Sequence, residues 1–149
     1  MTILANRMSL HHRECDALFA QADNAATSGD WAAARAAFDA FRNDLGAHFR
    51  VEEETIFPRF EAITGIVNGP TRMMRAEHAE MRAALERLEA AIAQQDAEEF
   101  AGESETLLIL MQQHNLKEES VLYPMCDHHL VGEIDVIARK VAVQLGEVH

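Results

Sequence analysis

The chain has 149 residues, a length typical of one domain with a substantial core, and residues 1–149 are treated as a single domain. Its formal net charge of −12 argues against nucleic acid and anionic membranes as partners, because both bind basic surfaces. No apolar run approaches the roughly 18 residues of a membrane span, and the N-terminus lacks the features of a signal peptide, so a cytoplasmic protein is expected.

Residues from about 3 to 27 are predicted to form the first helix, because apolar side chains recur there every three or four positions. His12 lies on this apolar stripe. His11 falls beside the stripe, on a wetter face with Arg7 and Glu14. We therefore expect His12 to be buried and His11 to lie at the surface.

The second helix is predicted from about residue 31 to residue 60, after a turn in which Asp30 is the N-cap. Pro58 has no backbone N–H, so it should kink or end this helix near Glu54. Only seven glycines and three prolines occur in the whole chain, which favours long helices over many short strands.

Two further long helices and one short helix complete the pattern. A third helix is predicted from about 71 to 94, and Asp96 opens the fourth. The periodicity breaks at residues 127–129, and a shorter fifth helix is predicted over about 130–146. Together these elements predict an all-α protein: an antiparallel up-down-up-down four-helix bundle over about residues 3–126 with a short additional C-terminal helix.

The chain contains two copies of one pattern, and a constant offset along the sequence relates them. Each copy has a lone His, then His-x-x-x-Glu-Glu, and then an aromatic residue followed by Pro. Equivalent residues in the two copies are His12 and His78, His48 and His114, Glu52 and Glu118, Pro58 and Pro124, and Asp30 and Asp96. The repeat indicates two helical hairpins that contribute the same polar side chains.

The predicted turns place these polar side chains at one height of the bundle. In an antiparallel helix hairpin, residues equidistant from the turn lie side by side. Residue 30 lies midway between His12 and His48. In the same way, residue 96 lies midway between His78 and His114, and residue 65 lies midway between Glu52 and His78. The candidate side chains of all four helices are therefore expected to meet.

Two buried carboxylates at this height require a compensating charge. His48 and Glu52 lie four residues apart and share one helix face, and the same holds for His114 and Glu118. Both pairs lie on apolar stripes, where a carboxylate without a cation or hydrogen-bond donors costs several kcal/mol. A dinuclear metal centre removes this cost. The predicted metal ligands are His12, His48, Glu52, His78, His114 and Glu118.

The remaining chemically notable side chains are assigned ordinary roles. The histidines expected at the surface or in loops are His11, His128, His129 and His149. The glutamates expected to be solvated are Glu53, Glu54 and Glu119; the alternative for Glu53 and Glu119 is a role behind the ligands. The residues expected to fill the core around the centre are Met8, Met74, Met81 and Cys15. Cys15 and Cys126 are expected to be free thiols.

The six candidates and their order resemble the hemerythrin-like family, also called the HHE cation-binding domain. That family has a His on the first helix, His-x-x-x-Glu on the second, a His on the third and His-x-x-x-Glu on the fourth, and the resemblance covers about residues 8–125. It implies a four-helix bundle with a non-haem di-iron centre, in which Glu52 and Glu118 bridge two iron ions. Imidazole and carboxylate ligands suit iron, and zinc or manganese can occupy such a site in vitro.

One departure from the family separates this chain from the oxygen carriers. Oxygen-carrying hemerythrins have a second His on the third helix, four residues from the first. The positions four residues from His78 hold Met74 and Arg82. The chain therefore offers four clear histidine ligands instead of five. A missing ligand leaves more open coordination, which favours chemistry or exchangeable metal over stable, reversible oxygen carriage.

The resemblance implies a protein that binds oxygen or a related diatomic ligand, such as nitric oxide, at the dinuclear site. Two alternatives stay open at this point. One is a di-iron enzyme that turns over peroxide or nitric oxide, and the other is an iron-handling or sensor module. The sequence predicts neither the physiological ligand nor the oligomeric state.

Overall fold

The computed structural model describes residues 3–146, and all regular secondary structure in that range is helical. In chain order the elements are α1 (Ile3–Thr27), α2 (Trp31–Val51), the π-helical segment η1 (Glu52–Ile56), α3 (Phe57–Thr64), α4 (Pro70–Ala93), α5 (Ala97–Lys117), the π-helical segment η2 (Glu118–Leu122), α6 (Tyr123–His129) and α7 (Ile134–Gln144). The prediction of an all-helical bundle is confirmed.

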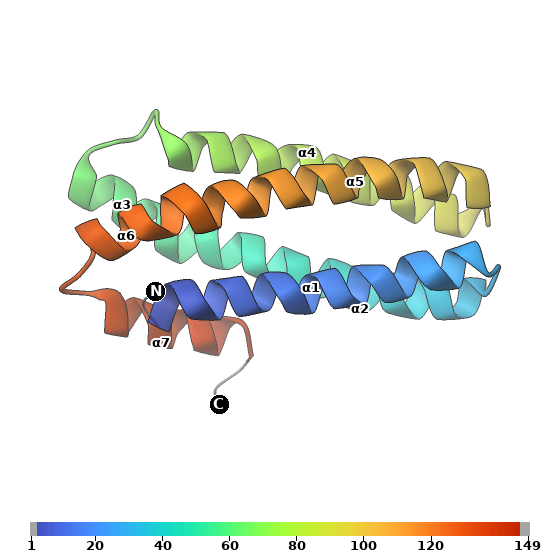
Figure 1. Cartoon of the computed structure of the whole chain (residues 1–149), viewed down its shortest axis with the longest axis horizontal. Coiled ribbons are helices and arrows are strands. Elements are labelled where there is room, and N and C mark those ends of the chain that lie inside the picture. The colour runs from blue at the N-terminus through green and yellow to red at the C-terminus, as the bar shows by residue number, and fades with distance from the viewer. Residues whose placement is uncertain (1–2, 147–149) are drawn as a thin grey trace.

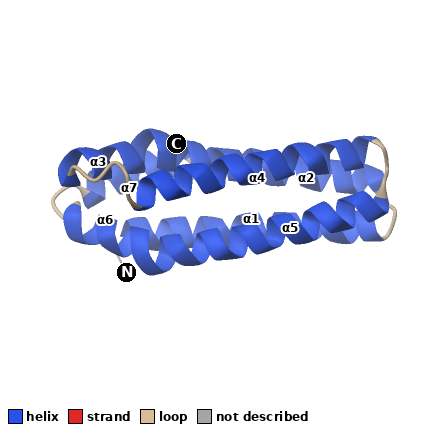
Figure 2. Cartoon of the chain, turned by 90° about the horizontal axis from the view of Figure 1, so that it is seen from above, coloured by secondary structure: helices blue, strands red, loops and turns tan. Residues whose placement is uncertain are grey.

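The long helices lie side by side along one axis (Figure 1). α1 packs along α2 and α4 packs along α5, so the chain forms two helical hairpins. Loops lie at the two ends of the bundle, and its body consists of helices (Figure 2). α7 packs against α1 near the N-terminal end of the chain.

The two hairpin turns, at equivalent positions of the repeat, are built in the same way. The side chain of Asp30 accepts a hydrogen bond from the backbone N–H of Ala33, and the side chain of Asp96 accepts one from the N–H of Glu99. The preceding residues, Gly29 and Gln95, both have positive φ angles, of 78° and 51°. The predicted N-caps are therefore confirmed, and the sequence repeat extends to the backbone.

Near Glu54, where Pro58 was expected to kink or end the helix, the α-helical register gives way to the π-helical segment η1, but the helix does not end. The helix passes through η1 and continues as α3 to Thr64. The N–H of Phe57 donates to the carbonyl of Glu52, five residues back, which is the wider π-helical register. The wider turn places the proline near the start of α3, where its missing N–H is tolerated. The same arrangement recurs in η2.

The C-terminal region also differs from its prediction. Residues 127–129, expected to break the helical pattern, form the last part of α6. Residues 130–133 form a turn that contains Gly132, and α7 begins only at Ile134. Glycine is a poor helix former, which accounts for the later start of this helix.

The apolar core is divided into two clusters along the bundle. The cluster nearer the two hairpin turns includes Cys15, Phe19, Phe41, Met81, Leu88 and Met111. The cluster nearer α7 includes Leu4, Met8, Ile56, Phe60, Met74, Leu122 and Val141. Met8, Met74, Met81 and Cys15 fill the core as predicted, and both cysteines are free. Along each long helix, buried polar residues lie between the two clusters.

The N-caps provide a test of this fold. We expect Asp30→Ala and Asp96→Ala each to lower the free energy of unfolding by about 1 kcal/mol, because each removes the side-chain acceptor for an unpaired helix N–H. Chemical denaturation monitored by circular dichroism measures the change. Asp30→Ser is the matched control, since serine retains a capping oxygen. Equal losses for the Ala and Ser variants would contradict the capping assignment.

Candidate metal centre

All six predicted ligands are buried at the level between the two apolar clusters. None is more than 4 % exposed. α1 contributes His12, α2 contributes His48 and α4 contributes His78. His114 lies near the end of α5, and the two glutamates are the first residues of η1 and η2. Apolar residues that recur every three or four positions therefore correctly predicted the buried face of each long helix at these residues.

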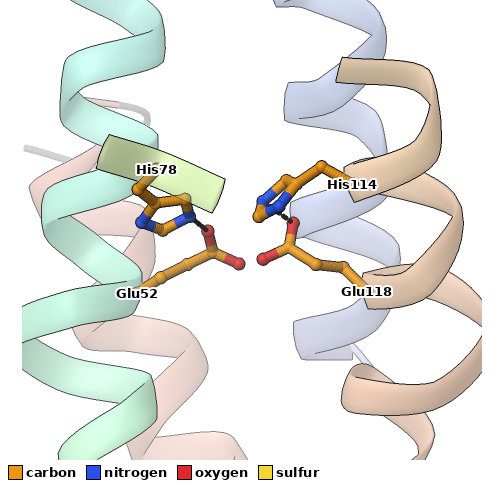
Figure 3. A group of neighbouring side chains, drawn as sticks. All are labelled: Glu52, His78, His114 and Glu118. Atoms are coloured by element: carbon orange, nitrogen blue, oxygen red, sulfur yellow. Dashed lines mark ion pairs between the residues drawn. The ribbon is translucent and has the colours of Figure 1, made fainter. Parts of the chain in front are cut away.

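The donor atoms of these residues form two overlapping sets, each within 4.8 Å of one another. The first set is His12, His48 and Glu118, and the second is Glu52, His78, His114 and Glu118. Figure 3 shows the second set, with the two histidines and the two glutamates facing one another. Glu118 belongs to both sets, which is the arrangement expected of a carboxylate shared by two cations.

Several atoms at the centre lack a hydrogen-bond partner. They are Oε1 of Glu52, Nε2 of His78, Nε2 of His114 and Oε2 of Glu118. The Nε2 atom of His78 lies 3.1 Å from Oε1 of Glu52, yet these atoms do not form a hydrogen bond. A buried polar atom without a partner costs about 1–3 kcal/mol. Imidazole nitrogens and carboxylate oxygens are metal ligands, so these residues fit a bound cation.

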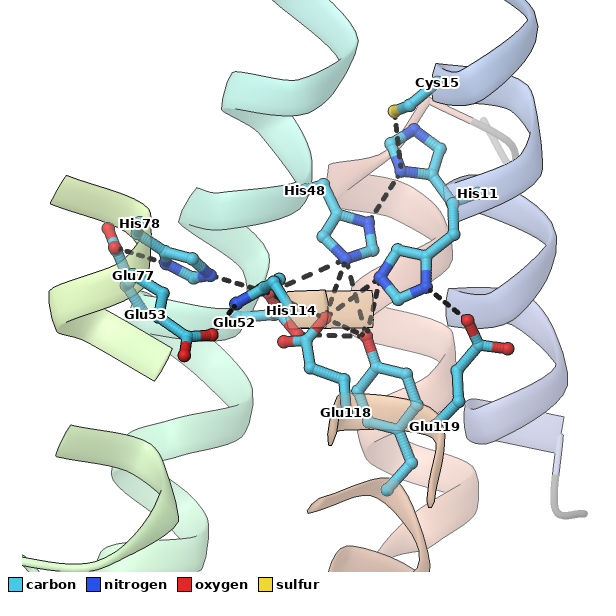
Figure 4. A network of polar contacts seen from close by, with 12 residues as sticks. His11, Cys15, His48, Glu52, Glu53, Glu77, His78, His114, Glu118 and Glu119 are labelled. Carbon is cyan, nitrogen blue, oxygen red and sulfur yellow. Dashed lines mark hydrogen bonds and ion pairs between the residues drawn. The ribbon is translucent and has the colours of Figure 1, made fainter. Parts of the chain in front are cut away.

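The Nδ1 atom of each predicted histidine ligand contacts a further side chain (Figure 4). The pairs are His12 with Glu119 at 2.9 Å, His48 with His11 at 2.8 Å, His78 with Glu53 at 2.7 Å, and His114 with Glu77 at 2.9 Å. With Nδ1 held in this way, Nε2 points toward the centre, which is how ligating histidines are oriented in metalloproteins. We call these four side chains the outer partners.

Two expectations about glutamates are corrected by this arrangement. Glu53 and Glu119 were expected to be solvated, with a role behind the ligands as the alternative; the alternative holds, because both contact a histidine of the centre. Glu53 also accepts two hydrogen bonds from Arg82 at 2.9 Å. In each Glu-Glu pair, the side chain of the second glutamate extends to a neighbouring helix. Glu53 thereby orients His78, and Glu119 orients His12. Glu54 is exposed, as expected.

The expectation that His11 lies at the surface is wrong. Its side chain is 3 % exposed, and its ring stacks on His48 with an interplanar angle of 4°. Successive residues of a helix point about 100° apart, so a helix with neighbours on two sides buries adjacent positions. α1 contacts both α2 and α5. His128 and His129 are exposed, and His149 lies outside the described residues.

Tyr123 also lies at the centre, although the spacing of the apolar residues did not predict it there. Its hydroxyl lies 3.0 Å from an oxygen of Glu52 and 3.0 Å from an oxygen of Glu118, so its single hydrogen can be donated to either carboxyl or shared between them. It also lies 3.4 Å from the Nε2 atoms of His12 and His48. The wider turn of η2 brings this residue inward. The equivalent residue in the first copy is Phe57. The hydroxyl present in only one copy is the sequence feature that could have indicated a polar role for Tyr123.

The two buried carboxyls differ in their affinity for a proton. Burial and the adjacent charge of Glu118 raise the pKa of Glu52 well above its usual range. Burial acts in the same direction on Glu118, but the charge of His114 and hydrogen bonds from its neighbours lower its pKa well below that range. In the absence of a cation, a proton shared by this pair therefore favours Glu52 over Glu118.

The histidines also divide into charged and neutral groups. Burial opposes a charge on His12, but hydrogen bonds with Glu118 and Glu119 raise its pKa to about 9. Burial and the charge of His12 lower the pKa of His48 to about 3. Burial also lowers the pKa of His78, to about 4. His12 thus carries a proton at neutral pH, and a cation bound at its Nε2 must replace that proton.

A helical bundle with a buried cluster of histidines and glutamates defines a class of helical cation-binding domains. The chain belongs to one family of this class, the hemerythrin HHE cation-binding domain family, whose model matches residues 4–126. No curated protein and no solved structure matches the chain. No helix in the described part of the chain has the length and apolar character needed to cross a membrane.

We expect the stabilisation of the fold by metal to increase with pH. The pKa of His12 is raised, so its proton stabilises the metal-free fold below pH 6.5, and this stabilisation is lost as pH rises through about 9. A bound metal ion requires the neutral imidazole of His12, so its affinity for the fold increases as pH rises toward the same pKa. Free metal at a thousandfold excess over its Kd increases the free energy of unfolding by about 4 kcal/mol. This increase corresponds to a rise of roughly 10 °C in melting temperature.

Thermal melts of the metal-loaded protein, with and without a chelator, test this dependence. The chelator should lower the melting temperature clearly at pH 7.5 and much less at pH 5. A larger effect at pH 5, or none at pH 7.5, would contradict a shared metal site at these residues.

Substitution of the ligands should separate the centre from the surface histidines. We expect Glu52→Ala and Glu118→Ala each to reduce the metal retained after gel filtration at least severalfold, because each removes a buried carboxylate donor. His128→Ala is the control, since His128 is exposed. Metal analysis measures the content of each variant. Equal metal content in all three variants would show that the metal is held elsewhere.

Proposed function

We propose that the chain is a non-haem di-iron protein that binds oxygen or a related diatomic ligand, such as nitric oxide, in the cytoplasm. In this proposal the fold is an antiparallel up-down-up-down four-helix bundle, and the two iron ions are held by His12, His48, Glu52, His78, His114 and Glu118. The observation that carries the proposal is the set of unpartnered nitrogen and oxygen atoms that face one another in a buried layer. Four imidazoles and two carboxylates are a donor set that suits iron.

The burial of the centre supports a small ligand. The six candidate side chains are at most 4 % exposed, and apolar clusters lie on both sides of them. A larger substrate would have to displace core side chains to reach the donor atoms. When bound, a pair of iron ions supplies open coordination positions and electrons for a diatomic molecule. The protein supplies the fixed donors and the exclusion of water.

The absent fifth histidine supports an open coordination position. Met74 is buried among apolar side chains, and the guanidinium of Arg82 is bound to Glu53. Neither residue therefore replaces the histidine that the oxygen carriers have near this point. The half of the centre at His78 and His114 has one protein donor fewer than in the carriers, which leaves a coordination position there for the diatomic ligand.

A di-iron enzyme acting on peroxide or nitric oxide is the second candidate, and Tyr123 favours it. The hydroxyl of Tyr123 is buried at the centre and hydrogen-bonded to the carboxylates. Burial and the neighbouring carboxylates raise the pKa of Tyr123 well above its usual range, so its hydroxyl keeps its hydrogen and can donate a hydrogen bond to a ligand that gains negative charge. A protein that only binds oxygen has less need of such a donor.

Anaerobic reconstitution with ferrous iron tests the first proposal. We expect about two iron ions per chain and an optical spectrum that changes on addition of oxygen or nitric oxide and reverts when the gas is removed. Reconstituted protein without stoichiometric iron, or with a spectrum unaffected by both gases, would overturn it. Rapid, irreversible oxidation would favour the enzyme.

Tyr123→Phe separates the two candidates, because it removes the hydrogen-bond donor and retains the aromatic ring. If the protein turns over peroxide, we expect this variant to lose at least tenfold in rate while it keeps its iron content. If the protein only binds the ligand, the affinity should change little. Phe57→Tyr, at the equivalent position of the first copy, is the matched control for changes in packing.

A further inference from the structure

The two copies of the sequence pattern give the centre an internal symmetry that extends to the outer partners. Glu119 holds His12 and Glu53 holds His78, and the constant offset of the repeat relates these two pairs. The symmetry relates one half-site, at His12 and His48, to the other, at His78 and His114. We call these the first and the second half-site. Any difference between them must arise where the two copies differ.

The copies differ in the outer partner of the second histidine of each half-site. His48 contacts His11, whereas the equivalent His114 contacts Glu77. His11 and Glu77 are themselves equivalent positions of the repeat. The second half-site therefore has a carboxylate behind both histidines, and the first has a carboxylate behind one and an imidazole behind the other.

A carboxylate outer partner changes how strongly a histidine binds a cation. It accepts the Nδ1 hydrogen, increases the electron density at Nε2 and fixes the tautomer that presents a lone pair to the metal. A second imidazole carries no such negative charge. Loss of a carboxylate outer partner typically costs about 10- to 100-fold in metal affinity. The first half-site has His11 at the position where the second half-site has Glu77. It should therefore bind a cation more weakly than the second half-site by a factor of this order.

Further contacts favour the second half-site. Glu77 also accepts a hydrogen bond from Lys117, and Glu53 accepts two from Arg82, so both carboxylates are fixed before a cation arrives. Oxygens of both Glu52 and Glu118 lie in the second set of donors, while the first set has only Glu118. In the first half-site, the hydroxyl of Tyr123 already lies 3.4 Å from the Nε2 atoms of His12 and His48.

We infer that the two half-sites bind divalent cations with different affinities. The half-site of His78 and His114 fills first and tightly, and the half-site of His12 and His48 fills second and exchanges its ion. This inference rests on the metal-binding part of the proposed function and deepens it, because it predicts a stable form with one metal ion. It does not depend on which gas the loaded protein binds.

Titration of the metal-free protein with Zn²⁺, in competition with a chromophoric chelator, tests the inference. We expect two binding steps whose Kd values differ by about 10- to 100-fold. His12→Ala should retain the tight step and lose the weak one. His78→Ala, at the equivalent position of the second copy, should lose the tight step. A single step, two equal Kd values, or loss of the tight step in His12→Ala would overturn the inference.

The outer partners provide a matched second test that does not remove a ligand. Glu77→Gln should weaken the tight step about 10- to 100-fold and leave the weak step unchanged, whereas Glu119→Gln should weaken only the weak step. Both side chains are partly exposed, so neither substitution opens the core. His11→Glu should strengthen the weak step. Equal effects of Glu77→Gln and Glu119→Gln on both steps would contradict two distinct half-sites.

The same titrations separate this inference from the proposed function. If no variant and no wild-type protein binds Zn²⁺ or ferrous iron, the metal centre itself is refuted. If two ions bind with equal affinity and the iron-loaded protein still responds to oxygen or nitric oxide, the proposed function stands and only the inequality of the half-sites fails.

Discussion

The burial of two carboxylates in an apolar bundle is the constraint on which the rest of the structure depends. Glu52 and Glu118 are fully buried, and neither can be ionised there without compensation. Each long helix therefore brings an imidazole to the same height, and a second layer of side chains holds those imidazoles in place. The polar layer divides the core in two because no apolar side chain can satisfy these oxygens. The two apolar clusters are separated at the height where the buried histidines and glutamates lie.

The backbone changes its register at these same two residues. Both π-helical segments begin at a buried glutamate and end just before an aromatic residue and a proline. The wider turn places each proline near the start of the next α-helix, and it also shifts which side chains point inward afterwards. Tyr123 reaches the centre by this route. A feature that accommodates a proline thus also places a hydroxyl beside the carboxylates.

The parts of the structure that the sequence predicted are those that depend on local pattern or on the repeat. The helix of residues 3–27 and the caps at Asp30 and Asp96 follow from spacing and side-chain chemistry within a few residues. The burial of His11 depends on how many helices surround α1, which spacing along one helix does not reveal. Tyr123 was missed because a π-turn changes the period on which the prediction relied. Comparison of the two copies residue by residue includes both positions among its candidates, since His11 aligns with Glu77 and Tyr123 aligns with Phe57 in the repeat.

Each set of donor atoms takes residues from both hairpins. The first set joins His12 and His48 to Glu118, and the second joins Glu52 to the residues of α4, α5 and η2. Contacts within each hairpin are more extensive than contacts between them, so each hairpin has its own cohesion. A cation held by either set would therefore join the two hairpins, which pack less extensively against each other than within themselves. Neither hairpin alone contains a complete set, so the donor atoms come together only when the two halves dock, and a cation bound to them would oppose the separation of the hairpins.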